Sequence, residues 1–287
     1  MTSGGLRFGY GTNGFANHRL DDALEVIKDL GYAGVALTLD HAHLDPFAPG
    51  LSRRVAALAA TLARLQLGVV IETGARYLLD PRRKHEPTLV SADGADRRVR
   101  FLRAAIDIAA DLGAEAVSFW SGTPGDGLST RTAWDRLEQR CASVVDHAER
   151  RDVALGFEPE PGMLVKDLAG YERLHTRLGR PPALGLTLDI GHCRCNEPLP
   201  VPECVRRAGD RLVNVQIDDM RRGEHIHREF GDGEIDFPPV LAALADISYT
   251  GLVSVELPRH SHDAPGAAGR ALAFLLAADL ERNGLLR

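Results

Sequence analysis

Eight short apolar segments recur along the chain, each separated from the next by a longer stretch, and this alternation limits the fold more than any other feature. The segments are continuous apolar runs, which is typical of parallel strands buried on both faces. Eight such strands with intervening helices in 287 residues predict an α/β fold, a single (β/α)8 or TIM barrel over residues 1–287. The expected strands are 6–10, 33–38, 68–72, 115–119, 153–158, 183–189, 212–217 and 252–256.

The stretches between these segments carry apolar residues at a helical period. In residues 20–30, for example, Leu20, Val26 and Ile27 fall on one stripe. A doubly wound open sheet is the alternative fold, but it would need a glycine-rich phosphate loop after the first strand. The sequence GYGTNGFAN matches that loop poorly, so the barrel is favoured. The expected helices are 20–30, 51–65, 95–112, 132–150, 167–178, 237–245 and 266–284.

Composition narrows the class of protein. A hydrophobic content of 44% is too high for a disordered chain, and a net charge of −6 without a basic cluster predicts no nucleic-acid partner. No apolar run reaches the roughly 18 residues of a membrane span, and no signal peptide is evident at the N-terminus. Four cysteines in a chain of this length do not indicate a disulfide framework. Together these features predict a cytoplasmic location with no membrane contact.

Acidic residues follow three of the expected strands. Glu158, Asp189 and Glu256 stand where strands 5, 6 and 8 end, and in a barrel these ends meet at one mouth. Each acid alone would be explained as a helix cap or an ion-pair partner. Together they would repel one another strongly unless a divalent cation lay between them. Oxygen ligands suit Mn²⁺ or Mg²⁺, and an added imidazole favours Mn²⁺, Co²⁺ or Zn²⁺.

Four segments around these acids resemble a known family. GFEPEPG, LTLDIGHC, VNVQIDD and VSVELPRH are similar to the metal-ligand strands of the sugar phosphate isomerase/epimerase family, within the xylose isomerase-like TIM barrel superfamily. The resemblance implies a divalent metal ion, with Mn²⁺ favoured and Mg²⁺, Co²⁺ or Zn²⁺ as alternatives. Strand 7 of this family usually supplies a histidine, where this chain has a glutamine. The implied ligands are Glu158, Asp189, Gln216 and Glu256.

The same resemblance suggests roles for histidines near the site. His192 follows Asp189 in the family's Asp-x-x-His pattern and would contact substrate, while His227 and Arg228 would orient substrate hydroxyls. In endonuclease IV of the same superfamily, the equivalent positions bind a further zinc. The set His192, His225 and His227 is therefore the expected second metal site, if there is one.

Two residues at other strand ends are further candidates for substrate binding. Glu72 would bind a substrate hydroxyl, or else pair with Arg76. Trp120 would form an apolar wall of the sugar pocket, or else cap the core. The nuclease of the superfamily would have histidines at these two strand ends, and their absence here argues against a nuclease.

The resemblance implies a metal-dependent isomerase or epimerase in carbohydrate metabolism. Its substrate would be a sugar, ketose or polyol, and Glu158 and Glu256 would transfer the proton through a cis-enediolate. The alternatives are an inosose dehydratase-like lyase, an endonuclease IV-like phosphodiesterase and a non-catalytic sugar-binding barrel. A homodimer or homotetramer is the expected assembly.

Overall fold

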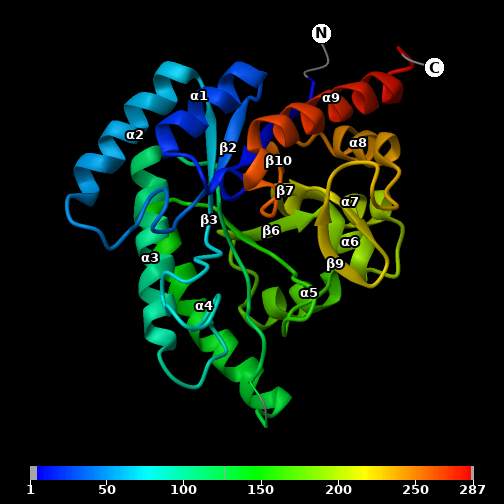
Figure 1. Ribbon diagram of the computed structural model, residues 1–287. Helices are drawn as coiled ribbons and strands as arrows, with labels where there is room; N and C mark the ends of the chain where they lie inside the picture. The colour runs from blue at the N-terminus through cyan, green and yellow to red at the C-terminus, as the bar shows by residue number, and fades with distance from the viewer. Residues whose placement is uncertain (1–4, 126, 286–287) are drawn as a thin grey trace.

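A computed structural model describes residues 5–125 and 127–285 and shows a closed barrel of eight parallel strands (Figure 1). Around the barrel the strands run in the order β1-β10-β7-β6-β5-β4-β3-β2, so that the first strand pairs with the last. The predicted TIM barrel is therefore confirmed. The strands are β1 (Arg7–Gly11), β2 (Gly34–Thr38), β3 (Gly68–Glu72), β4 (Val117–Phe119), β5 (Leu155–Phe157), β6 (Leu184–Asp189), β7 (Leu212–Ile217) and β10 (Leu252–Val255).

The helices form an outer layer around the strands, and the first helix packs against the last to complete the ring (Figure 1). Over the described ranges there are nine α-helices, two more than the sequence predicts. No helix in this part of the chain combines the length and the apolarity that crossing a bilayer requires. The helices are α1 (Leu20–Leu30), α2 (Leu51–Leu65), α3 (Ala95–Leu112), α4 (Thr130–Arg151), α5 (Leu168–Arg177), α6 (Ile190–Asn196), α7 (Val201–Ala208), α8 (Phe237–Asp246) and α9 (Ala264–Arg282).

The two helices absent from the prediction lie between β6 and β7. Helix α6 has only seven residues and begins directly after the strand, while α7 has eight and begins after Pro200. Each is about two turns long, too short for a helical hydrophobic period to stand out in the sequence. Strands β4 and β5 are also shorter than predicted, so that Glu158 lies just past the end of β5.

The long connection after β7 contains a β-hairpin that the sequence did not indicate. Strand β8 (Asp219–Arg221) pairs with β9 (Glu224–Arg228) in antiparallel fashion. The hairpin packs against α6 beside the mouth of the barrel (Figure 1). It thereby brings residues well beyond β7 back to the ends of β6 and β7.

A polar layer lies inside the barrel, just below its mouth. The side-chain amide of Asn214 on β7 donates to Thr187 on β6 at 3.3 Å and to Glu72 on β3 at 3.4 Å. On the neighbouring strand β5, a Cβ at Gly156 would lie 2.2 Å from the Thr187 hydroxyl oxygen, so only glycine fits there. The layer links the strands across the barrel interior and supports Glu72 from below.

A buried arginine anchors the long loop after β3. The guanidinium of Arg98 on α3 is 2% exposed and donates hydrogen bonds to three carbonyl oxygens of this loop, those of Thr73, His85 and Pro87, at 2.7–2.9 Å. It also lies 4.7 Å from the centre of the Trp120 ring. One side chain thus fixes both ends of the loop and the aromatic residue beside it.

We expect the substitution Arg98→Met to lower the free energy of unfolding by at least about 3 kcal/mol, because three buried carbonyl groups lose their donor. Urea denaturation would measure the loss. Arg100→Met is the matched control, since Arg100 lies on the same helix and is exposed. Equal losses in the two variants would show that other contacts hold the loop.

Candidate metal centre and active site

A cavity of about 600 Å³ opens at the C-terminal ends of the strands. Its volume is in the range of small-molecule sites, and this end of a (β/α)8 barrel is where active sites form. Most of the predicted site residues line it, although they come from strands and loops far apart in the sequence. They are Glu72, Trp120, Glu158, His192, Gln216, His225, His227 and Glu256.

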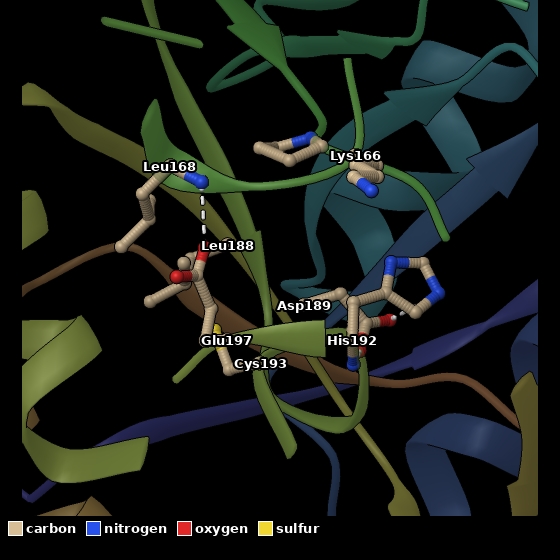
Figure 2. A pocket seen from close by; sticks show the side chains of 8 residues that line it. Lys166, Leu168, Leu188, Asp189, His192, Cys193 and Glu197 are labelled. Atoms are coloured by element: carbon tan, nitrogen blue, oxygen red, sulfur yellow. Dashed lines mark hydrogen bonds and ion pairs between the residues drawn. The ribbon is translucent and has the colours of Figure 1, made fainter. Parts of the chain in front are cut away.

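Asp189 lies at the end of β6, beneath the cavity, and its two carboxylate oxygens differ in their surroundings. One accepts the backbone N–H of His192 at 2.7 Å and so caps helix α6. The other is buried and has no hydrogen-bond partner in the part of the chain that the structure describes. Figure 2 shows the carboxylate beside the His192 side chain. Asp189 is therefore a helix cap that still has one free oxygen for a ligand.

Gln216 on β7 and Glu256 after β10 lie side by side. The side-chain amide nitrogen of Gln216 donates to one oxygen of Glu256, and Asn13 donates to the other at 3.0 Å. The Gln216 carbonyl oxygen is buried with no partner among the described residues. This oxygen and the free oxygen of Asp189 are the two orphaned acceptors of the predicted ligand set.

Glu158 belongs to an adjoining group. Its potential ligand atom lies within 4.8 Å of those of Glu160 and His192, whereas Asp189 and Glu256 form a similar group with His227. The His192 ring joins the two groups, because its nitrogens lie 3.5 Å from Glu158 and 3.8 Å from Asp189. The four predicted ligands thus surround one region without forming a single tight cluster.

Three imidazoles meet at the side of this region. The Nε2 atoms of His192 and His225 are 3.0 Å apart, and a ligand atom of His227 lies within 4.8 Å of one from each. The hairpin strand β9 supplies His225 and His227. Burial alone would lower the pKa of His227, but its ion pair with Asp218 raises the pKa to about 10.

The acidic groups of the site are buried and repel one another. Burial, reinforced by the neighbouring carboxylates, raises the pKa values of Glu72 and Glu158 well above the ordinary range. The same causes raise the pKa of Glu160 to about 8 and that of Asp189, against opposing charges and hydrogen bonds, to about 6. Such a set of carboxylates, with an amide oxygen and an imidazole beside it, fits a divalent cation.

The remaining predicted substrate contacts differ in position. Glu72 accepts from Asn214, while Arg76 donates instead to the carbonyl oxygen of Asn13 at 2.8 Å, so the alternative Glu72–Arg76 pair does not form. Trp120 both lines the cavity and caps the core, with 9% of its surface exposed. The Arg228 guanidinium pairs with Glu224 at 2.8 Å, and Arg228 is not among the described residues that line the cavity.

Several residues at the site were not among the predicted site residues. Glu160, whose EPEP context places it two residues after Glu158, could have been found from that spacing. Asn13 reaches the cavity from a short 3-10 helix (Thr12–Phe15) and His85 from the loop after β3, and the sequence contained no signal for either. The Nδ1 atom of His85 lies 2.8 Å from the carbonyl oxygen of Gly74, which fixes the ring at the cavity wall.

These features define a class: a closed (β/α)8 barrel whose mouth gathers side chains that could ligate a metal ion around a cavity. A family model described as the xylose isomerase-like TIM barrel matches residues 24–278. The chain belongs to this family, and the resemblance seen in the sequence is confirmed at that level.

Individual relatives are more distant. Mannonate dehydratase 1 from Halalkalibacterium halodurans is 28% identical over 149 residues, which cover 47% of this chain and 41% of that protein. The chain thus aligns with less than half of that relative's length.

Among solved structures, an L-ribulose 3-epimerase matches with a TM-score of 0.76 and 23% identity, covering 97% of this chain and 96% of that one. The IolI protein with a bound zinc atom matches with a TM-score of 0.74 and 17% identity, covering 96% and 99%. At these identities the structural matches show a shared fold.

Two carboxylates fix the segments that carry the site histidines. Asp219 accepts four backbone N–H groups of the GDGEI segment, from Gly231, Gly233, Glu234 and Ile235, at 2.9–3.2 Å. Near the other end of α6, Glu197 accepts the backbone N–H of Leu168 at 2.5 Å, as Figure 2 shows. The hairpin and α6 are thereby held at both sides of the site.

We expect Asp219→Asn to lower the free energy of unfolding by about 2–4 kcal/mol. An amide has one carbonyl oxygen in place of two carboxylate oxygens, so two N–H groups lose their acceptor. Urea denaturation is the measurement, and Asp232→Asn, an exposed acid in the same segment, is the control. A loss no larger than in the control would contradict the role given to Asp219.

Proposed function

We propose that this protein is a divalent-metal-dependent isomerase or epimerase that acts on a sugar, ketose or polyol by proton transfer. The observation that carries the proposal is the pair of orphaned, buried oxygens on Asp189 and Gln216, both of which are residues next to Glu256. Buried polar atoms in native proteins normally have partners, so unpaired ones at a mouth of this kind indicate a ligand. The name of the structurally similar L-ribulose 3-epimerase agrees with this class of reaction.

Asp189, Gln216 and Glu256 would hold the cation, with Glu158 completing the set from the adjoining group. Mn²⁺ is the preferred ion, because the set combines hard oxygens with a nearby imidazole, and Mg²⁺, Co²⁺ and Zn²⁺ are the alternatives. When bound, the ion would polarise a substrate carbonyl and so acidify the neighbouring C–H. Asn13 and Gln216 orient Glu256, and Ser118, 3.3 Å from Glu158, orients that carboxyl.

Glu158 and Glu256 are the proposed acid–base pair. One carboxylate removes the proton next to the carbonyl, which leaves a cis-enediolate. The other, which starts protonated, returns a proton to the opposite face of the same carbon or to the neighbouring carbon. The first outcome is epimerisation. The second is isomerisation, in which the hydroxyl proton also passes to the oxygen of the former carbonyl group. One turnover leaves the protonation states of the two acids exchanged, and proton exchange with water restores them.

The residues around this pair would bind the substrate. His192, Glu72 and His227 line the cavity with groups that can hydrogen-bond to hydroxyls, and Trp120 offers an apolar wall for the C–H face of a sugar. Arg228, which pairs with Glu224, would need to turn toward the cavity to take part. A second cation held by His192, His225 and His227 is part of the same proposal, because these three imidazoles offer nitrogens within 4.8 Å of one another.

A lyase reaction is the second candidate. One of the sequence relatives is named mannonate dehydratase 1. Loss of water can begin with the same removal of a proton next to a carbonyl. Mass spectrometry of the products separates the two reactions, since a dehydratase product is lighter by one water and an epimer is not.

We expect Glu158→Gln and Glu256→Gln each to lower turnover at least about 100-fold, because each removes one partner of the proton transfer. The assay is the incorporation of deuterium from D₂O into a panel of ketoses and inososes by the metal-loaded protein. Glu281→Gln, on the outer surface, is the control and should keep full activity. A metal-loaded Glu256→Gln protein with normal exchange would overturn the acid–base assignment.

We expect Mn²⁺ to raise the melting temperature of the metal-stripped protein, because an ion that binds only the folded chain stabilises it. At a Mn²⁺ concentration of 100 times the dissociation constant, the free energy of unfolding rises by about 2.7 kcal/mol. Asp189→Asn should abolish most of this gain, whereas Asp210→Asn, an exposed acid near the start of β7, should retain it. An equal gain in both variants would remove Asp189 from the metal site.

A further inference from the structure

The outer part of the cavity carries positive charge, in contrast to its acidic floor. Arg76 and Lys84 come from the loop after β3, and Arg259 follows β10; all three line the cavity. Lys84 and Arg259 are exposed, and neither forms an ion pair with any residue that the structure describes. Other surface arginines, such as Arg194 and Arg270, do pair with carboxylates.

These cations are close to the site, but they do not neutralise its acids by direct contact. The charges of Lys84 and Arg259 both act on the His225 imidazole, and that of Lys84 also acts on Glu160. Glu160 itself lies within salt-bridge distance of His192 and His225. Lys84 and Arg259 are thus exposed residues of the cavity wall that lie near the site without pairing with its acids.

The backbone that carries the cations is held firmly, although two of the side chains are free. Arg98 donates to the carbonyl oxygen of His85, the residue next to Lys84. Arg76 is tied to the carbonyl oxygen of Asn13. Leu257, two residues before Arg259, is fully buried. Fixed attachment points lower the entropy lost when a ligand orders these side chains.

We propose that the outer end of the cavity binds an anionic group of the substrate, so that the substrate class is a sugar acid or a sugar phosphate rather than a neutral sugar. Lys84 and Arg259 would donate hydrogen bonds to the anionic oxygens, and Arg76 would add positive charge. The inference rests on the proposed function for the other end of the substrate, whose hydroxyl and carbonyl oxygens would face the acidic floor. Carboxylate and phosphate share the required chemistry, because both accept charge-assisted hydrogen bonds from lysine and arginine.

Three probes of similar polyol structure test this. D-glucitol is neutral, D-gluconate carries a carboxylate and D-glucitol 6-phosphate carries a phosphate. Isothermal titration calorimetry on the Mn²⁺-loaded protein should show at least one anionic probe binding about tenfold or more tightly than D-glucitol, as expected for hydrogen bonds to charged groups. The anionic probe that binds more tightly shows whether the site prefers a carboxylate or a phosphate. Added salt should reduce this preference.

The double variant Lys84→Met and Arg259→Met should lose the preference for the anionic probe while keeping its melting temperature, since both side chains are exposed. The matched control is Lys28→Met with Arg53→Met, which removes the same charges from the outer helices α1 and α2 and should keep the preference. Equal affinity for the three probes, no measurable binding of either anionic probe, or an unchanged preference in the Lys84 and Arg259 variant would overturn the proposal.

The binding test is independent of turnover, so it separates this inference from the proposed function. An anionic preference with no deuterium exchange on any substrate would leave the anion site in place and refute the isomerase. Deuterium exchange on neutral ketoses without a preference for anionic probes would support the isomerase and refute the anion site.

Discussion

The crowding of buried carboxylates at the mouth of the barrel is the constraint on which the rest of the site depends. Glu72, Glu158 and Asp189 reach the same region from three strands, and burial makes each one costly to ionise. A chain without use for these acids would be more stable with apolar residues in their place. In the proposed site a divalent cation would offset the repulsion between Glu158 and Asp189, whereas Glu72 accepts a hydrogen bond from Asn214.

The hairpin after β7 brings a histidine close to the strand-7 position where this chain has Gln216. The family resemblance implies an imidazole ligand from strand 7, whereas Gln216 would supply an amide oxygen in the proposed site. His227 on β9 places a ligand atom within 4.8 Å of those of Asp189 and Glu256, so an imidazole still stands beside these two acids. Asp218 holds that ring through an ion pair, and Asp219 fixes the segment behind it. The hairpin therefore belongs to the site as much as the strands do.

Much of the fold could be predicted because the same sequence pattern, a short apolar run, recurs at each strand of the barrel. Each strand of a parallel barrel is buried on both faces, so a short apolar run such as GVVIE over 68–72 indicates its place directly. Strand β9 has the sequence EHIHR and is only partly buried, so its sequence shows no such run and the hairpin was not expected. Helices α6 and α7 were missed for a related reason, since each is too short to show a period.

The site residues, too, differ in how far the sequence could predict them. Acids at strand ends, such as Asp189 and Glu256, could be placed from the sequence because the barrel fixes where strand ends lie. Loop residues such as Lys84 and His85 could not, since their positions depend on tertiary contacts, including the three carbonyl groups that Arg98 holds. Arg228, which the sequence predicts to contact substrate together with His227, pairs with Glu224 in the structure.

This division has a chemical consequence. A metal site tolerates errors of only about 0.5 Å, so its ligands belong on strands that hydrogen bonds hold on both sides. Recognition of the far end of a substrate tolerates more variation and can be left to loops. A barrel of this kind can therefore keep its proton-transfer chemistry while loop residues such as Lys84 and Arg259 change the charge of the molecules it accepts. In the proposed function, the acidic floor would determine the reaction, and the basic residues at the opening would determine which substrates bind.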